Sequence, residues 1–303
     1  MNAQAHAPKR NPGPSWGFGF LLWADKWWPR WLFRPCLMAG TWVGFAFMPN
    51  QRACTREYLA VVLGRTATVI EMWRHFFALA ESLVLSLRVG RGVPLRCEMA
   101  PENAAEFEQL LQSKEPALYG TFHFGASDLL GYLLGERGLH VSIIRLQVDN
   151  SADTRLLGDR YAKHVSFLWI NDSSQLLFSL KEALDSGRSL ALKCDRLEFS
   201  AKAEPFDFLG ARRLFPFTIY HLAILFERPV VFCIATSNER ELALRVYSSP
   251  VFRPDPAAGR DANISAARRH FQAVLAHLEY MVRAHPFLWF NFLPLNPEAP
   301  SSG

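Results

Sequence analysis

Short apolar runs alternate with helical patterns along the chain after Gly92, and this alternation constrains the fold more than any other feature of the sequence. Near-continuous apolar strands that alternate with helices are typical of a mostly parallel sheet with helices on both faces. We therefore expect an α/β fold with a mostly parallel, mixed sheet flanked by helices. The predicted strands are 117–122, 141–146, 165–170, 189–194 and 230–235, and the predicted helices are 104–111, 129–134, 175–184, 217–226 and 266–283.

Two further segments complete the expected body of the protein. Residues 241–247 alternate between apolar and polar side chains, which predicts an added strand at the edge of the sheet. Residues 55–89 carry apolar side chains at three- and four-residue spacing, which predicts helix, and Gly64 is a point where this helix can break in two.

The N-terminal region is aromatic and contains six of the chain's nine tryptophans within its first 48 residues. Its longest uncharged apolar run, 35–48, makes a helix about 21 Å long, which is shorter than the ~30 Å hydrocarbon core of a bilayer. Tryptophan suits the headgroup level of a membrane. We predict a polar, disordered lead-in at 1–14, a membrane-associated helical anchor at 15–50 and a catalytic domain at 51–303. The alternative is an aromatic helix packed on the soluble core.

The composition excludes several classes of protein. A hydrophobic fraction of 50% with a net charge of +5 excludes global disorder. Five cysteines without a C-x-x-C pair indicate neither a disulfide scaffold nor a zinc site. Lys and Arg form no cluster longer than two residues, so we expect no nucleic-acid partner. No Walker or dinucleotide glycine pattern is present, and no cofactor or metal is expected.

The segment that carries chemistry follows the first predicted strand. His123 comes just past the carboxyl end of this strand, Gly125 permits a tight turn, and a helix is expected to begin near Ser127. Ligands of open α/β sheets bind outside the carboxyl ends of the strands. A strand–turn–helix path lets Asp128 fold back onto His123, and an acid on an imidazole fixes its tautomer and raises its basicity.

A histidine followed by an acid five residues later also occurs by chance. In that case His123 is a core histidine with satisfied hydrogen bonds, and Asp128 caps a helix. Ser127 lies outside any G-x-S-x-G elbow, which argues against a serine hydrolase.

The His123-x-x-x-x-Asp128 motif resembles that of the lysophospholipid acyltransferase superfamily. The order of features around it resembles the bacterial lauroyl/myristoyl acyltransferases of lipid A synthesis, over nearly the whole chain. These features are the aromatic N-terminus, the basic stretch 52–63, the His/acid motif, Arg145 at a strand end, Arg160, Lys193-Cys194-Asp195, Phe208-Leu209-Gly210, and Pro286 with Trp289.

This resemblance implies acyl transfer from a thioester, either acyl carrier protein or coenzyme A, to a hydroxyl or amine. His123 would be the general base and Asp128 its orienting acid. Arg160 and Asp195 match positions that the family needs, and we expect Arg160 to bind the donor phosphate or the oxyanion and Asp195 to hold Arg160 or the acceptor. The alternative for these two is a structural ion pair. Expected substrate contacts are Phe124, Gly125, Phe208 and Gly210, the last two in an apolar turn.

The resemblance also implies a place and partners: the bacterial inner membrane, with the catalytic domain on the cytoplasmic side and a membrane lipid or specialised lipid as acceptor. The chain departs from the lipid A enzymes because no cationic residue follows Arg283 and no second acid lies beside Asp195. This indicates a divergent branch, such as the predicted acyltransferases of aryl polyene or other specialised lipid pathways. The remaining alternatives are a thioesterase or lipid hydrolase with the same dyad, and a non-catalytic lipid-binding scaffold.

Overall fold

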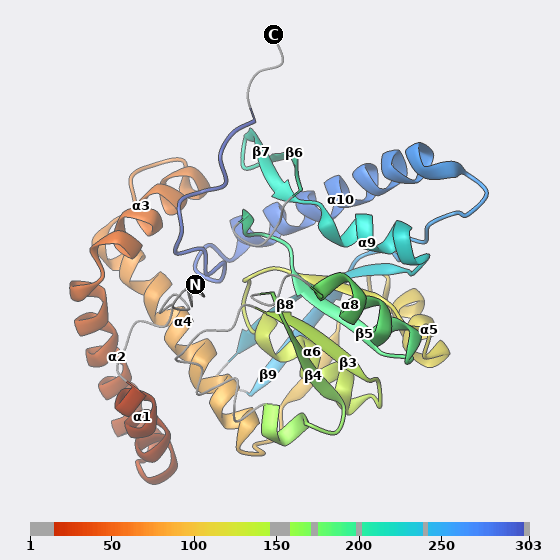
Figure 1. Ribbon diagram of the computed structural model, residues 1–303. Coiled ribbons are helices and arrows are strands. Elements are labelled where there is room, and N and C mark those ends of the chain that lie inside the picture. The colour runs from red at the N-terminus through yellow and green to blue at the C-terminus, as the bar shows by residue number, and fades with distance from the viewer. Residues whose placement is uncertain (1–14, 146–157, 171–174, 198–201, 239–241, 300–303) are drawn as a thin grey trace, which may run out of the picture.

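A computed structural model describes residues 15–145, 158–170, 175–197, 202–238 and 242–299 (Figure 1). Its centre is a seven-stranded sheet in the order β1-β9-β8-β2-β5-β3-β4. All neighbouring strands are parallel except β8 and β9, which confirms the expected α/β fold with a mostly parallel sheet. The strands are β1 (Arg96–Met99), β2 (Leu118–Thr121), β3 (Val141–Arg145), β4 (Val165–Trp169), β5 (Ser189–Lys193), β8 (Val230–Asn238) and β9 (Ala243–Ser248).

The sheet has one strand that the sequence did not predict. Strand β1 pairs with the outer side of β9, so the expectation that 241–247 forms an edge strand is wrong. Three of the four residues of β1 are exposed, and its sequence Arg-Cys-Glu-Met has no buried apolar run. A strand of this kind is held by its backbone pairing and leaves little trace in side-chain pattern.

Helices cover both faces of the sheet. On one face, α5 (Ala104–Ser113) and α6 (Ser127–Glu136) pack with strand residues around Tyr119 and Val231. On the other face, α8 (Leu176–Asp185), α9 (Thr218–Phe226) and α10 (Gly259–Ala284) pack around Phe122 and Phe232. A separate hairpin, β6 (Ala203–Phe208) with β7 (Ala211–Pro216), lies against α10. The sequence did not predict this hairpin either.

In the described part of the chain, four helices precede the sheet: α1 (Ser15–Trp27), α2 (Arg30–Phe47), α3 (Pro49–Leu63) and α4 (Val69–Gly90). The predicted break at Gly64 is confirmed, because α3 ends at Leu63 and Gly64 takes a positive φ of 66°. The next helix starts with a capping box between Thr68 and Glu71, which satisfies backbone donors in its first turn.

Helix α4 joins the first two helices to the rest of the protein (Figure 1). Phe45 of α2 packs edge-on against Phe76 of α4, with their ring centroids 5.1 Å apart. At the other end, Arg88 of α4 donates to Asp25 of α1 through Nε at 2.9 Å and Nη2 at 2.6 Å. Arg91 also pairs with this carboxylate. Because the side chains of Asp25 and Arg88 are only 6% and 8% exposed, this ion pair is buried and costly to break.

Within the described part of the chain, no helix combines the length and the hydropathy needed to cross a bilayer. The predicted lead-in at 1–14 lies outside the described residues.

Candidate active site

His123 lies just past the carboxyl end of β2, and a turn at Gly125 leads into α6. The turn is tight because Gly125 lies against β8, where it forms a bridge with Ala235. Its φ is +54°, and an added Cβ would come within 2.0 Å of the Ala235 carbonyl oxygen. Only glycine fits here, so this residue sets the path that turns the chain from the strand to the helix.

Asp195 of the neighbouring strand end binds His123. Thr121 of β2 is paired in register with Lys193 of β5, and both His123 and Asp195 follow two residues later. The Asp195 Oδ1 atom lies 2.7 Å from His123 Nδ1, and Oδ2 accepts the His123 backbone N–H at 2.8 Å. Because a carboxylate only accepts, Nδ1 carries the imidazole proton and Nε2 keeps its lone pair.

The two groups have shifted pKa values. Burial lowers the pKa of His123 below its ordinary value, and Lys193 and Arg196 oppose the raising effect of Asp195. Burial raises the pKa of Asp195, but His123, Arg196 and the Trp289 hydrogen bond together outweigh it, and the net shift is downward. At neutral pH the pair is therefore a carboxylate and an uncharged imidazole, which is the state a general base requires.

Asp128 has other partners than the sequence predicted. It lies in the first turn of α6, where its Oδ1 accepts from Lys193 Nζ at 2.9 Å and lies 3.7 Å from an Nη2 of Arg145. The expectation that Asp128 orients His123 is corrected, since Asp195 occupies the Nδ1 position. Burial raises the pKa of Asp128, but Lys193 and Arg145 lower it below its ordinary value. Asp128 therefore organises two cations beside the histidine.

The C-terminal segment passes directly over the histidine. The backbone N–H of Phe290 donates to the His123 carbonyl at 2.7 Å, and Gly125 N–H donates to the Leu288 carbonyl at 2.7 Å. Between them, the Trp289 indole Nε1 donates to Asp195 Oδ2 at 2.9 Å. Arg196 adds a hydrogen bond from Nη2 to the Phe290 carbonyl at 3.1 Å. Residues at the far end of the chain therefore complete the site.

Arg160 lies elsewhere. Its guanidinium is 5.5 Å from the centre of the Tyr161 ring and next to Gly92, which follows α4. The Tyr161 hydroxyl donates a hydrogen bond to Glu136, which is the last residue of α6. Asp128 lies in the first turn of the same helix. Eight helical residues separate those two positions by roughly 12 Å. The structure thus brings together His123 and Asp195, with Asp128 beside them, and does not bring Arg160 to this cluster.

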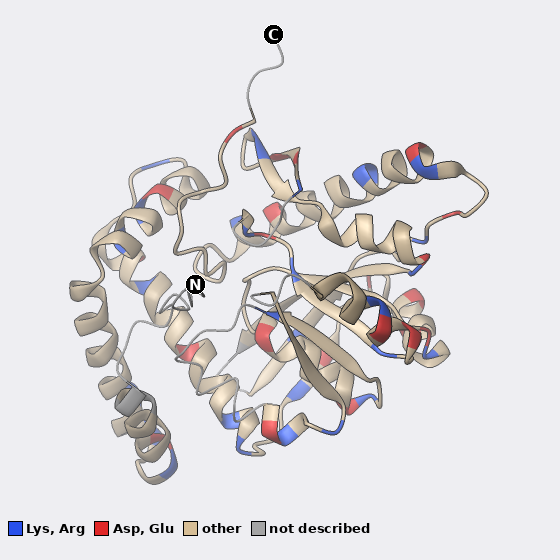
Figure 2. Cartoon of the chain, viewed as in Figure 1, with Lys and Arg blue, Asp and Glu red and all other residues tan. Residues whose placement is uncertain are grey.

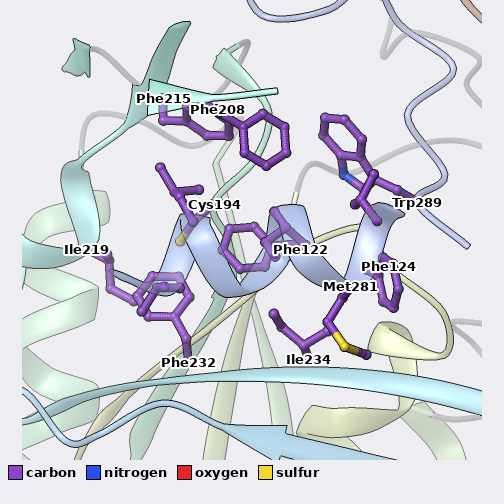
Figure 3. Packing of buried hydrophobic residues seen from close by; sticks show 14 of the residues in the cluster. Phe122, Phe124, Cys194, Phe208, Phe215, Ile219, Phe232, Ile234, Met281 and Trp289 are labelled. Atoms are coloured by element: carbon purple, nitrogen blue, oxygen red, sulfur yellow. The ribbon is translucent and has the colours of Figure 1, made fainter. Parts of the chain in front are cut away.

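The four predicted substrate contacts occupy packing or turn positions. Phe124 is fully buried and forms a bridge with Trp289. Gly125 lies against β8, as described above. Phe208 is 1% exposed and packs edge-on against the Trp289 ring, with their centroids 5.4 Å apart (Figure 3). Gly210 forms the β6–β7 turn and lines an open groove of about 640 Å³ between the hairpin and α10.

Three site residues were not predicted as such: Lys193, Arg196 and Trp289. Lys193 and Arg196 flank Asp195 in sequence, so their place at a strand end was the available signal. Trp289 was named only as part of the C-terminal Pro286–Trp289 pattern, and nothing local marks its contact with Asp195, which lies 94 residues away. In the described parts of the chain, no cluster of three or more His, Cys, Asp or Glu side chains is arranged to hold a metal ion.

No model of a known protein family matches the sequence, and no curated protein matches it. Among solved structures, the chain is similar to the crystal structure of the 1-acyl-sn-glycerophosphate (LPA) acyltransferase PlsC from Thermotoga maritima. The identity is 11% and the TM-score 0.40, over 81% of this chain and 96% of that chain. A likeness of this size assigns neither fold nor function.

We predict that Gly125→Ala destabilises the protein by about 3 kcal/mol or more, because the new Cβ meets backbone that cannot move aside cheaply. The matched control is Gly138→Ala, where φ is also positive at +80° but no atom lies within 4 Å of an added Cβ. The control should cost about 1 kcal/mol. Urea denaturation of both variants measures the difference, and equal losses would contradict the close approach at Gly125.

Proposed function

We propose that this protein is an acyltransferase that moves a fatty acyl group from an acyl thioester to a hydroxyl or amine of a lipid or glycolipid acceptor. The observation that carries the proposal is the His123–Asp195 pair at the carboxyl edge of the sheet, with Nε2 as the basic atom and cations alongside. The resemblance of the ordered motifs to bacterial acyltransferases agrees with this chemistry and favours acyl carrier protein or coenzyme A as donor.

The reaction follows from the orientation of the imidazole. Nε2 of His123 takes the proton of the acceptor hydroxyl or amine as the acceptor attacks the thioester carbonyl. Asp195 stabilises the imidazolium that forms. Collapse of the tetrahedral intermediate expels the donor thiolate, which receives the proton back from Nε2. No covalent acyl-enzyme is required.

The cations around Asp128 are the groups that meet an anion of the substrate. Lys193 lies close enough to act on the charge of His123, Arg145 lies beside Asp128, and their side chains are 23% and 28% exposed. Both phosphopantetheine donors and phosphorylated acceptors carry a phosphate, which such cations bind by charge-assisted hydrogen bonds. The phosphate-binding role expected of Arg160 therefore passes to Lys193 and Arg145 in this proposal.

An attachment to the inner membrane, on its cytoplasmic side, is part of the proposal. Helices α1 and α2 expose large apolar side chains at Trp23, Trp27, Trp31 and Phe47, which are 51%, 65%, 76% and 82% exposed. Figure 2 shows charged residues near the turn between these helices and almost none along the rest of α2. An exposed apolar surface with cations at one end suits a membrane interface.

The test of the function is comparative lipidomics of cells that express wild type or His123→Ala at matched levels. We expect a new acylated lipid with wild type only. His140→Ala is the control, because His140 is an exposed residue before β3. With purified protein, His123→Ala should lose ~10²–10⁴-fold in turnover, as removal of a general base does. Free fatty acid without an acylated lipid would instead favour a hydrolase. Full turnover in folded His123→Ala would rule out His123 as the general base.

The same assay separates the two acids. Asp195→Asn should abolish most of the turnover, because it removes the acceptor that sets the His123 tautomer, with a loss of roughly 10²-fold or more. Asp128→Asn should act mainly on KM, because Asp128 touches the cations and not the imidazole. The reverse ranking would restore Asp128 as the orienting acid.

The pH profile follows from the lowered pKa of His123. A base works only when unprotonated, so a lowered pKa moves the acid limb of kcat/KM below the ordinary histidine value of about 6.5. We expect activity to be nearly constant from pH 8 down to about 6.5 and to fall at lower pH. The measurement is kcat/KM from pH 8 downward until activity is lost, and a midpoint above 6.5 would disagree with the burial of the imidazole.

The membrane attachment predicts that replacing Trp23, Trp27, Trp31 and Phe47 with Gln weakens binding to vesicles by at least about tenfold, because each ring loses its apolar burial. Flotation with phosphatidylethanolamine–phosphatidylglycerol vesicles measures this. The control replaces Leu177 and Phe178 of α8, which are 51% and 76% exposed, and should bind like wild type. Equal flotation of both variants would refute an interface made by α1 and α2.

A further inference from the structure

We infer that Trp289 is a positioning residue of the active site, whose indole N–H holds the Asp195 carboxylate in the orientation that directs His123. The inference deepens the proposed function and rests on it for its kinetic part. It assigns a role in the reaction to the C-terminal segment, none of whose described side chains forms a hydrogen bond with the imidazole itself.

The Asp195 carboxylate is held by three donors. Oδ1 faces His123 Nδ1, and Oδ2 accepts both the His123 backbone N–H at 2.8 Å and the Trp289 indole at 2.9 Å. The Asp195 side chain is 1% exposed, so water has little access to replace a lost donor. The indole hydrogen bond is therefore the one side-chain contact, besides that of His123, that fixes the plane of the carboxylate among the described residues.

The backbone of Asp195 is held by the same C-terminal segment. Asn296 Nδ2 donates to the Asp195 carbonyl at 3.1 Å, seven residues after Trp289. The C-terminal segment therefore forms hydrogen bonds with both the side chain and the main chain of Asp195.

Trp289 is itself fixed from the N-terminal helices. His75 of α4 is fully buried, and its Nε2 lies 2.9 Å from the Trp289 carbonyl while its Nδ1 lies 3.1 Å from Thr55 Oγ1. A carbonyl only accepts, so Nε2 carries the proton and Nδ1 accepts from the Thr55 hydroxyl. Burial lowers the pKa of His75 to about 4, which keeps this arrangement neutral at physiological pH.

Aromatic packing adds to this support. Tyr58 of α3 packs edge-on against Trp289 with ring centroids 5.3 Å apart, and its hydroxyl donates to the Pro286 carbonyl at 2.7 Å. Phe208 contacts the indole as well, at a centroid distance of 5.4 Å (Figure 3). The indole is thus pre-set before any substrate binds, which is what a positioning group requires.

The direction of the effect on His123 follows from charge. A donor on Oδ2 draws electron density from the carboxylate and weakens its hold on an imidazolium. Removing the indole N–H while keeping the ring should therefore raise the pKa of His123 and loosen the geometry of the pair.

The experiment compares Trp289→Phe with Trp73→Phe. Trp73 is 8% exposed and stacks on Phe77, and its Nε1 has no hydrogen-bond partner among the described residues, so this control removes a buried indole without removing a hydrogen bond that the structure shows. We expect kcat of Trp289→Phe to fall about tenfold, the size of one hydrogen bond to a charged group, with KM unchanged. Its acid limb should move upward by about 0.5 to 1 pH unit. Trp73→Phe should match wild type in kcat, in KM and in the position of the acid limb.

A second readout needs no activity. In protein with ¹⁵N-labelled histidine, the His123 resonances are assigned by their loss in His123→Ala and titrated without substrate from pH 8 down to the lowest pH at which the protein stays folded. We expect His123 of Trp289→Phe to begin protonating at a higher pH than in wild type and Trp73→Phe. If wild type shows no acyl transfer but this shift appears, the proposed function fails and the coupling of Trp289 to His123 stands.

Identical kinetics and titration for Trp289→Phe and wild type would overturn the inference. If Trp289→Phe does not fold, His75→Phe provides the test. His75 stacks on Phe292 with centroids 4.4 Å apart, so phenylalanine keeps the stack and removes the bond to the Trp289 carbonyl. A smaller upward shift of the His123 titration is expected, and a wild-type titration would again overturn the inference.

Discussion

The buried carboxylate of Asp195 is the interaction on which the rest of the site depends. Burial of a charge is costly unless hydrogen bonds compensate for it, and Asp195 receives them from His123 and Trp289. These donors come from the end of β2 and from the C-terminal segment, while Asp195 itself follows β5. One ion therefore holds together three stretches of chain that are far apart in sequence, and loss of any donor leaves a buried charge less well satisfied.

The two acids of the site, Asp195 and Asp128, have different roles because they contact different side chains. Asp195 faces the imidazole and sets its tautomer, whereas Asp128 faces Lys193 and Arg145. Both pKa values lie below the ordinary range, so both acids are charged while the imidazole stays neutral. The result is a basic nitrogen beside a pair of cations, an arrangement suited to a reaction in which a proton leaves the acceptor near an anionic group.

Helix α4 connects the aromatic N-terminal helices to this chemistry. Its C-terminal end carries Arg88, which pairs with Asp25 of α1, and its N-terminal third carries His75, which forms a hydrogen bond with the Trp289 carbonyl. Ser82 of the same helix donates to the Gly125 carbonyl at 3.1 Å. The proposed membrane-facing surface and the active-site turn are thus fastened to the same rigid element, which sets the height of the site relative to any surface that α1 and α2 contact.

The sequence by itself determined the α/β class, the break at Gly64 and the position of His123 at a strand end, because apolar periodicity, glycine and strand–helix order are local properties. It did not reveal β1, whose side chains are mostly exposed. It also did not reveal the β6–β7 hairpin, although these two short strands bury Phe206, Phe208 and Phe215. It also paired His123 with the acid nearest in sequence. Only the tertiary structure decided that Asp195 takes that place, because the register of β2 with β5 sets His123 beside Asp195 across 72 residues. The positions of Trp289 and Arg160 were likewise decided by the tertiary structure, because packing between segments distant in sequence sets where each side chain lies.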